Sequence, residues 1–92
     1  MKIETPKRIA DFFKRNHIKP NKPFLWNGET NYFGMNDDDI ICIKVADDHI
    51  VVSFLDYERI RKKYEPIVEA EFGKPYETIR LGYRHLFIKG EL

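Results

Sequence analysis

The chain lacks most of the features that identify chemistry in a sequence. It has one cysteine among 92 residues, so an intramolecular disulfide is excluded, and its three histidines are too widely spaced to complete a zinc-binding pattern. Neither a glycine-rich phosphate loop nor a nucleophile motif is present. We therefore expect no metal and no cofactor.

Long apolar segments are also missing. The longest uninterrupted run of apolar side chains covers residues 40–43, far short of the ~20 residues that a membrane-spanning helix needs. Residues 1–10 lack the apolar run of a signal peptide. The sequence therefore predicts a cytoplasmic protein that does not enter a membrane and keeps its cysteine reduced.

Charge of one sign does not dominate, because the net charge is only +1. The sign changes along the chain, with a net +5 in residues 1–26, −7 in residues 27–58 and +3 in residues 59–92. A near-neutral chain with an acidic centre has little general affinity for nucleic-acid phosphates. The hydrophobic content of 42% excludes disorder, and 92 residues form one domain that spans residues 1–92.

What the chain does contain is a strong β-hairpin pattern in residues 40–55, around the turn Asp47-Asp48. With a two-residue turn the numbers of facing residues sum to 95, which places Lys44 opposite Val51. Side chains alternate between the faces of a strand, so one face of this hairpin is wholly apolar. That face consists of Ile41, Ile43, Val45, Ile50, Val52 and Phe54. We expect the core to lie against it.

Two helices are predicted on either side of the strands. Thr5-Pro6 opens the first, because threonine caps free N–H groups and proline suits the first helical position. This helix should end near Asn16 or His17, and the charge of His17 favours a helix C-terminus. Asp56 is the predicted cap of the second, which runs to residue 73 with a kink or break where Pro66 removes a backbone hydrogen bond.

The remaining strands follow from turn and alternation signals. Asn27-Gly28 suits a tight hairpin turn and joins two further strands, in which Gly34 permits a bulge or a close approach. Residues 78–89 alternate and predict a final strand whose main apolar row faces the core. The element order α-β-β-β-β-α-β predicts an α+β fold, an antiparallel sheet with two helices packed on one face.

Two acidic turns, residues 37–39 and Asp47-Asp48, supply oxygen atoms of the kind that bind Mg²⁺ or Ca²⁺. In the predicted hairpin they lie at opposite ends of one strand, ~20 Å apart. Aspartate is also a common turn residue. We therefore predict no metal site.

Cys42 and His49 are the thiol and imidazole nearest to each other in sequence, and such a pair can form an activated nucleophile. The hairpin register separates them by ~13 Å. Cys42 lies between isoleucines and is interpreted as a small hydrophobic residue. We therefore predict that the protein is not an enzyme and has no catalytic residues.

The sheet face turned away from the helices is the predicted partner surface, because apolar residues remain uncovered there and large uncovered patches seldom stay exposed. The uncovered residues are Ile40, Val51, Leu55, Leu86 and Ile88. We predict a small module of the adaptor, inhibitor or immunity type that binds another protein, with a homodimer as another way to cover this face. The predicted contact residues are Lys44, Val51, Arg80, Tyr83, Arg84 and His85.

Nucleic-acid binding is the alternative function. If Arg80 and Arg84 point away from the helices, they share the open face with Lys44, and Tyr32 offers a ring on which a base can stack. The chain nevertheless lacks the aromatic motif and the glycine loop of common RNA-binding domains. Protein binding is therefore the leading hypothesis.

Overall fold

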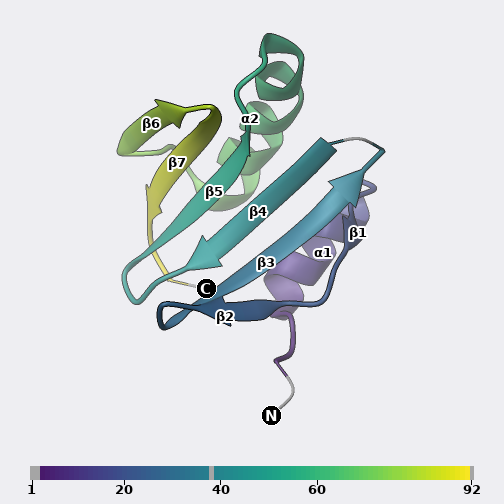
Figure 1. Ribbon diagram of the computed structural model, residues 1–92, viewed down its shortest axis with the longest axis vertical. Helices are drawn as coiled ribbons and strands as arrows, with labels where there is room; N and C mark the ends of the chain where they lie inside the picture. Colours follow the sequence, from purple (N-terminus) through teal and green to yellow (C-terminus); the bar gives the residue numbers. More distant parts are fainter. Residues whose placement is uncertain (1–2, 38, 92) are drawn as a thin grey trace.

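The computed structural model describes residues 3–37 and 39–91, and over these residues it contains two helices and seven strands (Figure 1). The elements are α1 (Lys7–Arg15), β1 (Lys19–Pro20), β2 (Phe24–Trp26), β3 (Glu29–Asn36), β4 (Asp39–Val45), β5 (His49–Leu55), α2 (Glu58–Phe72), β6 (Glu77–Leu81) and β7 (Tyr83–Lys89). The predicted α+β fold is confirmed. Asp38, part of the first acidic turn, lies outside the described residues.

All strand pairs are antiparallel, and the order across the sheet is β1-β3-β4-β5-β7-β6, with β2 also paired to β3. The predicted register of the central hairpin is confirmed, since Lys44 lies opposite Val51 and Ile41 opposite Phe54. The Ala46 N–H donates to the His49 carbonyl at 2.9 Å and closes the turn. A two-residue turn therefore fixes which side chains of this hairpin face the core.

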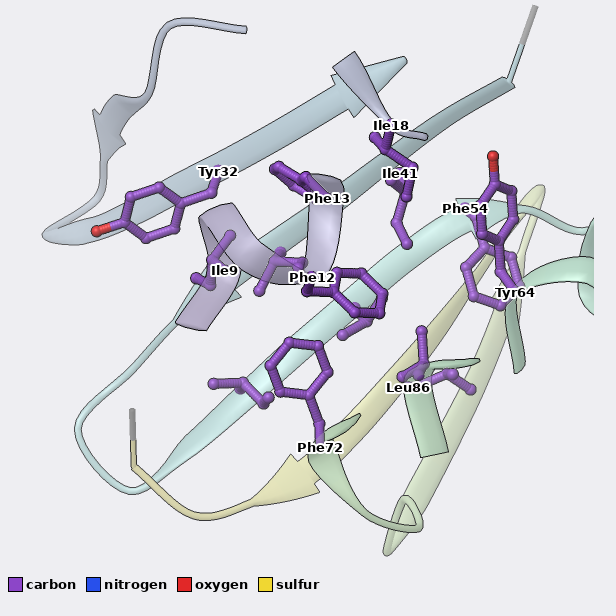
Figure 2. Close-up of a cluster of buried hydrophobic side chains, with 14 of the residues drawn as sticks. Ile9, Phe12, Phe13, Ile18, Tyr32, Ile41, Phe54, Tyr64, Phe72 and Leu86 are labelled. Carbon is purple, nitrogen blue, oxygen red and sulfur yellow. The ribbon is translucent and has the colours of Figure 1, made fainter. Parts of the chain in front are cut away.

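Both helices cover the apolar face of the hairpin, and the core lies between them and the sheet (Figures 1 and 2). The rings of Phe12 on α1 and Phe72 on α2 meet edge to face, with their centroids 5.1 Å apart. Phe54 of β5 contacts Tyr64 of α2 in the same layer. Complete burial of an aromatic or branched side chain contributes about 1.5–3 kcal/mol, so this layer is the main source of stability.

The C-terminus of α1 is closed by a backbone motif that needs a left-handed residue. His17 has φ 57°, its N–H donates to the Lys14 carbonyl, and the Ile18 N–H donates to the Phe13 carbonyl at 2.8 Å. These two bonds satisfy carbonyls that the helix end leaves free. The predicted helix opening is shifted by one residue, because Pro6 itself is the N-cap and no side chain caps α1.

Helix α2 contains Pro66 and is not broken there, so of the two predicted effects of this proline the break does not occur. Ile60, Tyr64 and Val68 are buried on one side of the helix and hold both halves against the sheet. Asp56 does not cap the helix, since the N-cap is Tyr57 and no side chain provides a cap hydrogen bond. No helix of the described residues is both long and apolar enough to cross a bilayer.

The predicted last strand is a hairpin of β6 and β7. Gly82, with φ 72°, allows the chain to reverse between them. The predicted orientation of this segment is wrong: Leu86 and Ile88 are fully buried against the core, whereas Leu81 and Tyr83 are exposed on the opposite face. The pairing of β7 with β5 sets these faces, because Val52 lies opposite Leu86.

Candidate functional site

The candidate site is the open face of the sheet, the face on which neither helix packs (Figure 1). Strand register aligns rows of side chains across this face. The central row runs from Phe33 on β3 through Cys42, Ser53 and His85 to Ile79 on β6. Polar groups therefore occupy the middle of the row and apolar groups its two ends.

A groove of ≈ 500 Å³ follows this row, which is within the range of about 300–1,000 Å³ typical of binding pockets. Its polar lining consists of Asn31, Cys42, Lys44, Ser53 and His85. Its apolar lining consists of Val51, Ile79, Leu81, Tyr83 and Phe87, most of which belong to the β6–β7 hairpin. No carboxylate is among these residues, so the lining carries one formal positive charge, that of Lys44.

Hydrogen bonds already join several polar groups of the groove. Ser53 Oγ lies 2.7 Å from His85 Nδ1, and the Cys42 thiol lies 3.8 Å from Asn31 Oδ1, to which it donates. Burial raises the pKa of the Cys42 thiol, so at neutral pH this sulfur is protonated and a poor nucleophile. These contacts fix the relative positions of four hydrogen-bonding side chains on the groove floor.

The Ser53–His85 pair was not predicted, because 32 residues separate the two positions and only the β5–β7 register brings them together. A serine nucleophile also needs a group that orients the histidine and donors for an oxyanion. Among the described residues no hydrogen bond links His85 to a carboxylate. We interpret the pair as a hydrogen bond between β5 and β7 that holds both side chains in the groove.

Four of the six predicted contact residues line the groove: Lys44, Val51, Tyr83 and His85. The expected position of Arg80 and Arg84 on the open face is wrong. Both lie on the helix side of the sheet, where Arg80 Nε donates to Asp56 Oδ2 at 2.7 Å and Arg84 forms an ion pair with Glu65 of α2. The β5–β7 register that buries Leu86 also places these two arginines on the helix side of the sheet.

Tyr32 is also absent from the open face. Its ring is buried in the core beneath α1 (Figure 2), so it offers no stacking surface for a base. Val51 lies on the open face but is nearly fully buried by its neighbours. Among the apolar residues that line the groove, the most accessible are Leu81, 76% exposed, and Tyr83, 47% exposed.

One aspartate of each acidic turn takes part in another contact. Asp39 is buried and bonds to Arg59 at 3.1 Å and Lys63 at 3.3 Å, both on α2, and these hydrogen bonds lower the pKa of its carboxyl. Asp48 lies 2.7 Å from His49 Nδ1. No group of three or more potential metal ligands occurs within residues 3–37 and 39–91.

Comparisons with protein-family models, with characterised proteins and with solved structures found no significant match. The site is therefore interpreted from its own geometry.

Proposed function

We propose that the protein is a small non-enzymatic binding module whose groove receives a segment of another protein. The observation that carries this proposal is the exposed apolar wall of Leu81 and Tyr83 beside an ordered polar floor. Apolar surface arranged in this way is a usual mark of a protein contact. A cytoplasmic location, in which Cys42 stays reduced, belongs to the same proposal.

The groove lining specifies the chemistry of the partner. Leu81 and Tyr83 favour apolar side chains, and Ser53 with His85 favours groups that accept or donate hydrogen bonds. Lys44 favours a carboxylate, because no acid lines the groove and its ion pair with Glu29 is 3.6 Å long. The expected partner is a protein segment with apolar residues next to an Asp or Glu.

Nucleic-acid binding receives less support. Two of the three cations on which it depends, Arg80 and Arg84, face the helices and are paired with Asp56 and Glu65. Lys44 alone provides too little charge for phosphate-driven binding.

Capture with tagged protein, followed by titration with the purified partner, tests the proposal. Leu81→Asp places a charge in the groove, whereas Leu25→Asp changes another exposed leucine, 61% exposed, that does not line it. We expect Leu81→Asp to weaken binding about tenfold or more, equivalent to 1.4 kcal/mol, and Leu25→Asp to have little effect.

Two results would contradict the proposal. One is equal affinity of Leu81→Asp and wild type for every partner recovered. The other is recovery of nucleic acid alone, in amounts that fall as salt rises, which would support the nucleic-acid alternative.

A further inference from the structure

The two outer edges of the sheet differ in their resistance to pairing with another strand. At one edge β1 and β2 are two and three residues long, and Pro20, Lys22 and Pro23 lie in or between them. Short strands, proline and lysine are common means by which proteins prevent edge-to-edge association. This edge is therefore protected.

The other edge, β6, has none of these features. Its five residues include no proline, glycine or lysine, and among the described strands it pairs with β7 alone (Figure 1). The Tyr76 N–H donates to the Phe87 carbonyl on β7. The Phe87 carbonyl therefore points toward β6, and the pairing of Glu77 with Phe87 turns the backbone N–H and C=O groups of Glu77, Ile79 and Leu81 toward β7. The backbone groups of Thr78 and Arg80 point the other way, away from β7. The free side of β6 thus presents backbone groups to a further strand.

Strand β6 is compatible with a second copy of itself. In an antiparallel pair related by a twofold axis at Ile79, this residue faces its own equivalent, and Thr78 faces Arg80 on the helix side. No like charges face each other in this register, because Arg80 faces Thr78 and Glu77 faces Leu81 of the second copy. Leu81, 76% exposed in the single chain, would lie diagonally next to Ile79 of the second copy.

We propose that the chain forms a symmetric dimer by antiparallel pairing of β6 with β6 of a second copy. The twofold axis is perpendicular to the joined sheets, so both open faces lie on the same side. The dimer then presents two equivalent grooves to a partner. This assembly does not depend on what the groove binds.

Sedimentation equilibrium of the purified full chain tests the pairing. At roughly 100 μM, where a dimer with a micromolar dissociation constant is populated, we expect a mass near twice 11.0 kDa. Thr78→Pro removes an outward N–H and should raise the dissociation constant about tenfold or more. Thr78→Ala keeps that N–H and should dimerise normally. A monomeric wild type, or equal association of both variants, would overturn the proposal.

A charge-swap experiment tests the register. Ile79→Lys and Ile79→Glu each place like charges opposite one another across the twofold axis and should be monomeric, while an equimolar mixture should recover the dimer. Circular dichroism verifies that each variant is folded. Failure of the folded variants to associate on mixing would refute the Ile79 register. Thr78 does not line the groove, so Thr78→Pro should still bind a partner and thereby separates this proposal from the proposed function.

Discussion

Among the glycines of the chain, Gly34 is the one at which an added Cβ would be most crowded. A Cβ there would lie 2.5 Å from Ile18 Cγ2 and 2.9 Å from the Lys19 carbonyl oxygen. The predicted close approach is therefore confirmed. The contact explains how the segment after α1 packs tightly onto β3.

Gly34→Ala should lower the free energy of unfolding by about 1–3 kcal/mol, because backbone as well as a side chain must move to make room. Urea denaturation followed by circular dichroism measures this loss. Gly28→Ala is the control, since its Cβ meets nothing within 4 Å and only its positive φ opposes the change. A Gly34→Ala variant as stable as the wild type would show that the added Cβ is not crowded.

At the scale of single elements, a substitution at the C-terminus of α1 should make the protein more stable. His17 adopts φ 57°, a conformation that costs a residue with a Cβ about 1–2 kcal/mol and glycine much less. His17→Gly should therefore raise the midpoint of thermal unfolding. His17→Ala keeps the Cβ and should not raise it, and a stabilised alanine variant would argue against the left-handed conformation as the cause.

Helix α2 is held to the sheet by a buried carboxylate. Asn replaces Asp39 with little change in shape but without the charge that Arg59 and Lys63 contact. Asp39→Asn should lower stability at pH 7 by about 1–3 kcal/mol, the usual contribution of hydrogen bonds to charged groups.

This effect of Asp39→Asn should depend on pH. The pKa of Asp39 is lowered in the folded protein by its hydrogen bonds to Arg59 and Lys63, so its stabilising effect is complete above the unfolded-state pKa of about 3.9. The effect is lost as pH falls through the lower, folded-state pKa. Urea denaturation from pH 7 to pH 2 should show the two proteins converging at the acidic end, and a constant difference would contradict this assignment.

The sequence was sufficient to predict the register of strands that are adjacent in the chain. The Asp47-Asp48 turn and the alternation beside it determined the β4–β5 register. The faces of β7 were not predictable in the same way, because apolar side chains occur on both, Tyr83 on one and Leu86 on the other. Which face of β7 packs on the core is decided by its pairing with β5, a strand distant in sequence. Because the prediction chose the other face, it placed Arg80 on the wrong side of the sheet and did not identify the Ser53–His85 contact.

At the scale of the whole molecule, one layer of aromatic rings joins both helices to one face of the sheet. Phe12→Ala should therefore lower the free energy of unfolding by about 3–5 kcal/mol, a large part of the 5–15 kcal/mol that is typical of small proteins. Urea denaturation provides the test. Phe24→Ala, which removes a ring that is 45% exposed, should cost clearly less, and similar losses would contradict this account of the core.

Trp26 is the only tryptophan of the chain and lies at the end of β2 with 66% of its surface exposed. An indole in contact with water fluoresces much as it does in an unfolded chain, so its emission is a poor measure of folding. The same exposure leaves the folded protein open to collisional quenchers. Any molecule that covers the β2 end of the sheet should shift the emission to shorter wavelength and reduce quenching, which makes Trp26 an intrinsic optical probe for contacts at that edge.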